Sequence, residues 1–529
     1  MTTSTDTSPT DPPPTGTDVD DGASTDAATT APARGSWIDV AALALLALVV
    51  RIPAYLADRG LSFDDGVFAN SAIAMRNGGM PFRDVFSSQG PMFLPLVWVG
   101  DLIGTRTLDS PRVLAVVSGI VAVLATYWAA LRLTDRVGAV LAAGLLATSG
   151  GLAWVTGPLA ADGPALAFAA IAMGLAVRQR DHATWWRAVL LGAAVGAVLS
   201  TKSLEAPVLV PVAIVLLAPV VSAARRRQVH VEALTQGLIA AASAGVVFLA
   251  VSLPWGMADV WDQSVRYRTD AAADRDIPAT ALKAVTTLWD RDLALIFFAV
   301  LALGFGIAAY RRTGHARSAR VAPDASWWSR RGPDDAGHWV PSGRLLTVSW
   351  LACTLGWLVL VVSPLWRPHL AAVSIPLVLV IGVYRPPTRV VLVGAVLAVP
   401  MVVIQLDGLL SPGPYRGTEA ELVRALEELP RDAWVISDEP GVVWRSGLRT
   451  TDDLVDSSML RREQERYTED SLVADAADPR VCAFIRISEQ RFAHFAALPD
   501  RLEELGFVAD PDVGDGDVLY VRSDCTPTS

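Results

Sequence analysis

Cysteine and lysine are both scarce in this chain of 529 residues. The cysteines are Cys353, Cys482 and Cys525, and the lysines are Lys202 and Lys283. The sequence contains no closely spaced cysteine pair, no His-Glu-x-x-His, no Walker lysine motif and no glycine fingerprint of a dinucleotide-binding strand-turn-helix. Zinc, ATP and dinucleotide chemistry therefore have no support in the sequence.

Charge is also sparse, and apolar residues take its place. Charged residues make up 19% of the chain and hydrophobic residues 52%, and the mean hydropathy is +0.39. This composition is too apolar for a soluble chain of such length, so it predicts an integral membrane protein.

The first 35 residues break the apolar trend. The segment MTTSTDTSPTDPPPTGTDVDDGASTDAATTAPARG is mainly Ser, Thr, Pro, Asp and Ala, with almost nothing to bury. Such a segment predicts a disordered cytoplasmic tail over residues 1–35. The apolar run after it is long and is followed by polar residues rather than a small-residue cleavage site. We therefore expect an anchor and not a signal peptide.

Long apolar runs predict the membrane spans. A hydrocarbon core about 30 Å thick needs about 20 apolar residues per helix. The short segment 90–104 contains two prolines and Asp101, which suits a juxtamembrane or re-entrant helix better than a span. We expect about eleven spans, at about 37–57, 111–132, 137–157, 163–179, 184–200, 205–223, 234–254, 291–310, 344–363, 368–385 and 388–406.

Arginine-rich loops predict the orientation, because short basic loops favour the cytoplasm. All of these loops lie on the same side of the membrane if residues 90–104 do not cross it, and not if they do. We therefore predict a multi-pass plasma-membrane protein with a cytoplasmic N-terminus, an outer loop at 58–110 and an extracytoplasmic C-terminal domain. The basic loops are RLTDR (132–136), RQRDHATWWR (178–187), ARRRQ (224–228), RRTGHARSAR (311–320) and YRPPTR (384–389).

The chain changes character after the last span. Amphipathic helical segments alternate with short β-rich runs such as AWVIS and DVLYVRS, which predicts a small α/β domain over residues 409–529. The expected fold class is thus an all-α membrane bundle over 36–408 with this small outer domain. The domain is acidic, which argues against a nucleic-acid partner. Cys482 and Cys525 lie in it, where an oxidising environment would permit a disulfide, although free thiols fit equally well.

Two adjacent acids, Asp64 and Asp65, follow the first predicted span in SFDDGVFANSAIAMRNGG. Carboxylates beside a bilayer are costly unless they are paired, hydrated or functional. Repulsion between neighbouring carboxylates also raises one pKa toward the range that suits a general base. The alternative is that the acids cap the N-terminus of the helix that this segment predicts.

The stretch FDDGVFANSAIAMRNGGMPFRDVFSSQGPMFLPL resembles the first outer loop of the polytopic GT-C glycosyltransferases. The protein O-mannosyltransferase and aminoarabinose-transferase-like branch is the most similar. Its pattern is an acidic pair, an aromatic four residues after the first acid, a glycine before Pro-Phe, and Lys-Pro-Pro-Leu. Here the pair is Asp64 and Asp65 and the aromatic is Phe68, but Gln89 stands where the lysine would be.

Two later segments extend the resemblance to about residues 37–406. Asp162 in GPLAADGPALAF begins a span after an outer loop, and Lys202 lies in GAVLSTKSLEAPVLVP, where the family commonly has Thr-Lys. The resemblance implies an inverting glycosyltransferase that needs no metal or other cofactor. Its donor would be a sugar on polyprenyl phosphate, and its acceptor an extracytoplasmic glycan, lipid or protein of the cell envelope.

In such an enzyme Asp64 would act as the general base that takes the acceptor proton, and Asp65 would orient Asp64 or the acceptor. Cations would stabilise the charge that gathers on the leaving phosphate. The candidates for binding donor or acceptor are Asp162, Lys202, Arg367, His369, Arg266 and Gln89. The alternatives are a helix cap for Asp162, snorkelling for Lys202, interfacial anchoring for Arg367 and Arg266, and a structural role for His369.

Two other function classes fit the composition. A lipid or glycan transporter or flippase would show an inverted repeat or paired broken helices, and neither is evident in the sequence. A non-catalytic glycan-binding scaffold would need far fewer spans for anchoring.

Overall fold

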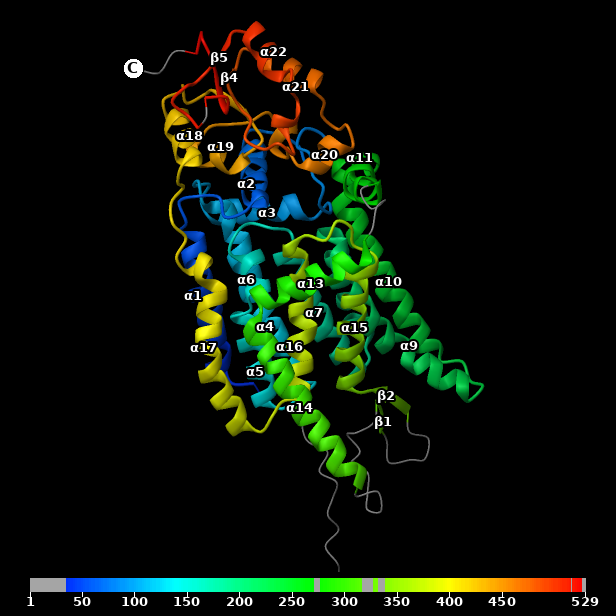
Figure 1. The fold of residues 1–529 in the computed structure, drawn as a ribbon. Helices are drawn as coiled ribbons and strands as arrows, with labels where there is room; N and C mark the ends of the chain where they lie inside the picture. Colours follow the sequence, from blue (N-terminus) through cyan, green and yellow to red (C-terminus); the bar gives the residue numbers. More distant parts are fainter. Residues whose placement is uncertain (1–34, 271–275, 316–326, 332–337, 515, 526–529) are drawn as a thin grey trace, which may run out of the picture.

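The computed structural model describes residues 35–270, 276–315, 327–331, 338–514 and 516–525. It shows a long helical bundle with a smaller mixed domain at one end (Figure 1). Apart from Gly35, the tail predicted at 1–35 lies outside the described residues. Within these ranges six helices are long and apolar enough to cross a membrane, or up to eight if each of two bent pairs is one span.

The six long helices are distributed over residues 37–410 of the sequence. Short 3₁₀ turns at Ser110–Arg112 (η1), Ser203–Val208 (η2) and Leu253–Trp255 (η3) extend three of them. The helices are Trp37–Tyr55 (α1), Val113–Ala130 (α4), Leu209–Arg225 (α9), Val231–Ser252 (α10), Gly343–Leu360 (α15) and Thr388–Leu410 (α17).

The bent pairs are Arg136–Ala147 (α5) with Gly150–Thr156 (α6), bent by 53°, and Ile277–Arg291 (α13) with Leu293–His315 (α14), bent by 101°. Polar side chains satisfy the backbone groups that these breaks expose. Asp292 accepts hydrogen bonds from Ser149 Oγ at 2.7 Å and from Gly151 N at 3.2 Å. Gln405 of α17 donates to Thr148 O at 2.9 Å and accepts from Ala294 N at 3.3 Å, which ties the two breaks together.

Three further helices coincide with the remaining predicted spans. They are Asp162–Asp181 (α7), Trp185–Thr201 (α8) and Ser374–Val383 (α16), the last preceded by the 3₁₀ segment Arg367–Val373 (η6). Charged residues near both ends of α7 lower its hydropathy, and the other two are short. The total of eleven spans therefore stays a prediction.

Small residues let the bundle helices approach closely. A Cβ on Gly192 of α8 would lie 2.1 Å from the Ala240 carbonyl oxygen of α10, and one on Gly196 would lie 2.7 Å from that of Ala244. The shared core is rich in buried alanine, valine and leucine from α4, α5, α7, α8 and α16. Close backbone contact thus holds helices that lie in a largely apolar medium.

Short elements form the outer layer above the bundle (Figure 1). Segment 90–104 contains one of them, a helix that packs against the helix of residues 63–76. These elements are Phe63–Arg76 (α2), Phe93–Ile103 (α3), Met257–Trp261 (α11), the π-helical turn Asp262–Arg266 (η4) and Tyr267–Asp270 (α12). At the other end lies the hairpin Trp328–Arg331 (β1) and His338–Pro341 (β2).

The C-terminal domain is built on a four-stranded sheet of order β3-β4-β6-β5. Strands β3 and β4 are parallel, whereas β6 pairs antiparallel with both β4 and β5. The strands are Trp434–Ser437 (β3), Val481–Ile485 (β4), Phe507–Ala509 (β5) and Leu519–Arg522 (β6). The helical segments are Thr418–Glu427 (α18), Pro440–Ser446 (α19), Asp453–Val455 (η7), Met459–Glu463 (α20), Glu469–Ala476 (α21), Phe492–His494 (η8) and Leu498–Glu504 (α22).

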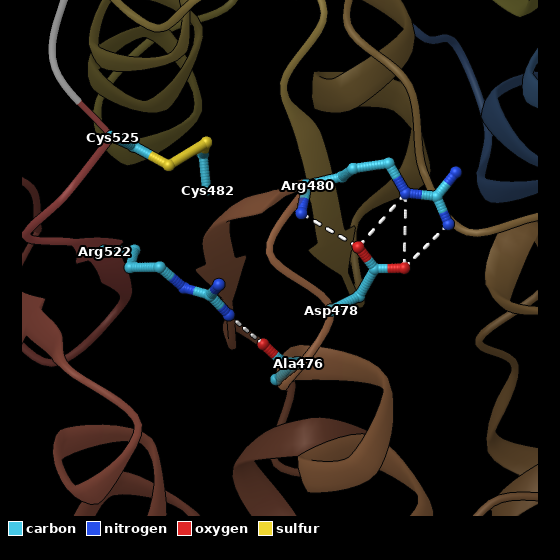
Figure 2. The surroundings of a disulfide bond; sticks show 6 residues. All are labelled: Ala476, Asp478, Arg480, Cys482, Arg522 and Cys525. Carbon is cyan, nitrogen blue, oxygen red and sulfur yellow. Dashed lines mark hydrogen bonds and ion pairs between the residues drawn. A yellow bond between two sulfur atoms is a disulfide. The ribbon is translucent and has the colours of Figure 1, made fainter.

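A disulfide joins Cys482 of β4 to Cys525 beyond β6, with their Cα atoms 5.6 Å apart (Figure 2). The sequence left open whether these two cysteines pair, and the structure shows that they do. Nearby, Arg522 donates a hydrogen bond to the Ala476 carbonyl. Disulfides persist in oxidising compartments, which agrees with an extracytoplasmic domain.

The C-terminal domain packs on α2 through its helix α19. Gly66 lies directly against Gly441, because a Cβ at Gly66 would come within 2.3 Å of the Gly441 nitrogen. Asn70 Nδ2 donates to the Pro440 carbonyl at 2.8 Å. Arg445 donates to the carbonyl of Ala57 at 2.6 Å. The outer loop and the C-terminal domain thus form one packed unit.

Replacing Gly66 by alanine should separate α2 from the C-terminal domain, because the added methyl group meets backbone that cannot move aside. We expect a loss of about 1–3 kcal/mol in the free energy of unfolding, the usual cost of overpacking. The measurement is thermal unfolding in detergent micelles, with limited proteolysis of the C-terminal domain.

The matched control is Gly245→Ala in α10, where an added Cβ meets nothing within 4 Å. Helix propensity predicts that this control keeps or raises stability. An unchanged melting temperature for Gly66→Ala would contradict the close contact.

Candidate active site

A cavity of about 440 Å³ lies between the bundle and the C-terminal domain. We call it the polar lobe, because charged side chains of both parts line it. From the membrane part these include Asp64, Ser88, Gln89, Trp154, Lys202, Arg268, Arg291 and His369, and from the C-terminal domain Asp456, Ser458, Ser488, Gln490 and Arg491.

A second cavity of about 410 Å³ adjoins the first. We call it the apolar lobe, because most of its other walls are apolar, including Phe248, Trp357 and Val361. The residues that line both lobes form their boundary, and they are Ser88, Gln89, Lys202, Arg268 and His369. A molecule with an apolar chain and a polar head would fit across this boundary.

Asp64 lies in the first turn of α2 and lines the polar lobe. The cap of this helix is Ser62, whose hydroxyl accepts a hydrogen bond from Asp65 N at 3.2 Å. The helix start therefore does not depend on the Asp64 carboxylate as a cap. Within the described residues that carboxylate forms no ion pair and no hydrogen bond, so it is available to a substrate.

Burial raises the pKa of Asp64 from 3.8 to about 6. Lys202 and Arg268 oppose this rise in the pKa, while the like charges of Asp162 and Asp456 add to it. A carboxylate with such a pKa is ionised at neutral pH and is a stronger base than an exposed aspartate.

Asp65 faces away from the cavity and is fully buried with Arg112. Its carboxylate accepts hydrogen bonds from Arg112 Nε at 3.2 Å, from Leu61 N at 3.0 Å and from Leu159 N at 2.9 Å. Arg112 also donates to the Ala57 carbonyl at 2.8 Å. The adjacent acids are thus separated: Asp65 fixes the start of α2, and Asp64 alone reaches the cavity.

Lys202 connects Asp162 to the lobe boundary. Its Nζ lies 2.7 Å from Asp162 Oδ2, and both residues are buried. An ammonium group has three hydrogens, so two remain for a ligand after this bond. Glu205 is buried nearby, and within the described residues its Oε1 has no hydrogen-bond partner.

The other boundary residues surround Ser88. Arg268 Nη2 donates to Ser88 Oγ at 3.0 Å, and Gln89 Nε2 donates to the same oxygen at 3.3 Å. His369 Nδ1 accepts a hydrogen bond from Trp366 N at 3.3 Å. This bond places the proton of a neutral His369 ring on Nε2. The boundary therefore offers an ammonium, a guanidinium, an amide and an imidazole to one ligand group.

Four predicted residues line neither lobe: Asp65 and Asp162, whose partners are given above, and Arg266 and Arg367. The Arg266 side chain is 66% exposed and pairs with Asp262 and Asp270, and Arg367 is exposed. Arg268 takes the place expected of Arg266, since residues two apart point to nearly opposite sides of a helical turn. Arg268, two residues after the predicted Arg266, is thus the arginine of this segment that lines both lobes.

Other lining residues were not predicted from the sequence. Asp456 and Arg491 come from the C-terminal domain, and Arg291 stacks on Trp154 at 5.0 Å. No motif marks any of them, because only the packing of the C-terminal domain on α2 and of α13 on α6 brings them into the cavity. Within the described residues no group of three or more His, Cys, Asp or Glu could hold a metal ion.

Known proteins share this architecture. Residues 88–249 match the family model described as dolichyl-phosphate-mannose-protein mannosyltransferase. The crystal structure of apo ArnT from Cupriavidus metallidurans has a TM-score of 0.57 and is 14% identical, covering 93% of this chain and 99% of that chain. The same protein bound to undecaprenyl phosphate has a TM-score of 0.54 at the same identity and coverage. No curated protein sequence matches.

A more distant similarity agrees with this result. The Archaeoglobus fulgidus oligosaccharyltransferase in complex with Zn and sulfate has a TM-score of 0.51 and is 14% identical, covering 92% of this chain and 73% of that chain. The chain therefore has the fold of polytopic GT-C membrane glycosyltransferases, and the resemblance to the O-mannosyltransferase and ArnT type is confirmed.

Replacing Arg112 by methionine should leave the Asp65 charge buried without a cation. Loss of one partner of a buried ion pair costs about 3–5 kcal/mol, so we expect a large drop in melting temperature or a failure to accumulate in membranes. The measurement is thermal unfolding of the purified protein in detergent micelles.

The matched control is Arg136→Met, which breaks an ion pair with Asp39 in which the arginine side chain is 53% exposed. Exposed pairs contribute about 0–1 kcal/mol, so this variant should unfold almost like the wild type. Equal melting temperatures for the two variants would show that the buried pair does not hold α2.

Proposed function

We propose that this chain is a membrane glycosyltransferase that transfers a sugar from a polyprenyl-phosphate donor to an extracytoplasmic acceptor. The acceptor class is a glycan, lipid or protein of the cell envelope. The observation that carries the proposal is the placement of Asp64, an available carboxylate, in a cavity that shares a cationic boundary with an apolar lobe.

The apolar lobe suits the prenyl chain of the donor, and the boundary suits its phosphate. Lys202 and Arg268 supply positive charge there, and Gln89 and His369 supply further polar groups. Gln89 replaces the lysine of the family pattern, and Lys202 lines the same boundary. Lys202 therefore supplies at this boundary the positive charge that the neutral Gln89 does not carry. Undecaprenyl phosphate bound to ArnT, which has the same fold, supports this donor class.

The chemistry follows from these positions. The Asp64 carboxylate accepts the proton of the acceptor hydroxyl as that oxygen bonds to the anomeric carbon of the sugar. The bond from this carbon to the phosphate oxygen breaks, and its electron pair stays on the phosphate. Lys202 and Arg268 stabilise the charge that develops there. Attack opposite the leaving group inverts the anomeric carbon, and the products are the glycosylated acceptor and polyprenyl phosphate.

The proposed topology has eleven spans in the plasma membrane, with the N-terminus in the cytoplasm and the C-terminal domain outside. The arginine-rich loops support this orientation through the positive-inside rule. The Cys482–Cys525 disulfide supports an oxidising compartment for the C-terminal domain. Asp64 and the lobes then lie at the outer surface, where lipid-linked donors replace nucleotide sugars.

Replacing Asp64 by asparagine should remove the base while keeping the size of the side chain. We expect transfer to fall by about 100-fold to 10,000-fold, the usual contribution of a general base. The measurement is incorporation of radiolabelled sugar from polyprenyl-phosphate donors in membranes that contain the full chain.

The control for this variant is Asp58→Asn, a carboxylate of the same outer loop that does not line either lobe. Both variants should keep the wild-type melting temperature. Full transfer activity in Asp64→Asn would exclude Asp64 as the base.

The pH dependence of transfer should follow the ionisation of Asp64. Because burial raises its pKa to about 6, the base becomes protonated and inactive below that pH. We therefore expect kcat/KM to rise along an acid limb centred near pH 6 and to level off above it. A profile that stays flat across this range would contradict the assignment.

A further inference from the structure

A loop of the C-terminal domain reaches into the polar lobe beside Asp64. The loop follows η7, and Asp456, Ser458 and Leu460 of this segment line the lobe. Asp456 is 6% exposed, and its Oδ1 accepts a hydrogen bond from Ser458 N at 2.9 Å. The described residues provide no ion pair and no other hydrogen bond for its carboxylate, although cations occur elsewhere in the cavity.

Three other acids near the cavity have partners, whereas Glu205, whose Oε1 has no hydrogen-bond partner within the described residues, lines neither lobe. Asp162 pairs with Lys202, and Asp65 with Arg112. Asp438 accepts hydrogen bonds from three backbone N–H groups, those of Ile487, Ser488 and Phe492. The two acids that line the lobe without such partners are Asp64 and Asp456. A buried carboxylate without a partner is costly, so its retention in a cavity indicates a ligand with hydrogen-bond donors.

The loop that carries Asp456 is held firmly. Arg461 Nη1 donates to the carbonyls of Asp453 and Asp456, each at 2.7 Å, and its guanidinium lies 4.1 Å from the Phe86 ring centre. The Tyr267 hydroxyl lies 3.2 Å from Ser458 Oγ. Contacts to both the loop and the membrane part therefore fix the position of Asp456 before any ligand binds.

We propose that Asp456 binds hydroxyl groups of the transferred sugar and so makes the C-terminal domain part of the donor site. The proposal rests on the proposed function. The sugar is bonded directly to the donor phosphate, and the phosphate-binding residues line both lobes. With the prenyl chain in the apolar lobe, the sugar must occupy the polar lobe, which Asp64 and Asp456 line. Sugar hydroxyls supply the donors that the Asp456 carboxylate lacks.

The test separates binding of the sugar from binding of the phosphate. Full-length protein in detergent micelles is titrated with a panel of polyprenyl monophosphate sugars, both hexoses and pentoses, and with polyprenyl monophosphate without a sugar. Wild type should bind at least one sugar-bearing lipid more tightly than the bare lipid. Asp456→Asn should lose this preference, by about 10-fold to 100-fold for a hydrogen bond to a charged group, and should keep its affinity for the bare lipid.

The matched control is Asp452→Asn, which changes a partly buried carboxylate of the same segment that does not line either lobe. This variant should keep the preference for the sugar. Retained affinity for the bare lipid also shows that each variant is folded. A preference that survives in Asp456→Asn, or an equal loss of affinity for both lipids, would overturn the proposal. So would a wild type that binds both lipids equally.

Two results distinguish this proposal from the function on which it rests. A wild type that binds no polyprenyl phosphate contradicts the proposed function itself. In the transfer assay, Asp456→Asn should raise KM for the donor far more than it lowers kcat. The acid limb of kcat/KM in this variant should also move to lower pH, because removal of a like charge lowers the pKa of Asp64. An unchanged limb and an unchanged KM would overturn the role of Asp456.

Discussion

The buried ion pair between Asp65 and Arg112 is the interaction on which the outer half of the molecule depends. It joins the start of α2 to the start of α4, while backbone N–H groups of Leu61 and Leu159 complete the shell of the carboxylate. One face of α2 is thereby fixed to the bundle, and another face receives the C-terminal domain at Gly66. Asp64 is held between these two contacts without making either of them. Asp65 and Asp64 are thus neighbours in sequence, but Asp65 is buried in an ion pair and Asp64 lines a cavity without a partner among the described residues.

The cavity combines environments that rarely coexist at a membrane surface. The apolar lobe is lined mostly by apolar side chains, the boundary concentrates positive charge, and the polar lobe keeps carboxylates without cationic partners. Positive charge beside unpaired acids would normally collapse into ion pairs. Here Lys202 is bound by Asp162 and Arg268 by Ser88, so neither is drawn onto Asp64. The fixed partners preserve an open site for a ligand that carries both negative charge and hydroxyl groups.

The sequence predicted those parts of the fold and site that local pattern controls. Apolar runs located the bundle helices, and four residues singled out in the sequence, Asp64, Gln89, Lys202 and His369, line the lobes. Residues brought in by tertiary packing escaped this reasoning, since Asp456 and Arg291 reach the cavity only through contacts between distant segments. Arg268 rather than Arg266 lines the lobes, because residues two apart point to nearly opposite sides of a helical turn. The span total depends on bent and short helices, which hydropathy alone does not count.

The cavity wall supplied by the C-terminal domain has a consequence for biogenesis. Because the C-terminal domain follows the bundle in the chain, the bundle is synthesised before the strands of this domain. The domain folds around β4 and β6, and the disulfide joins β4 to the segment after β6, so this wall forms only after these later strands are made. A partly made chain thus has the residues that line both lobes but not the complete polar lobe, whose remaining wall belongs to the C-terminal domain.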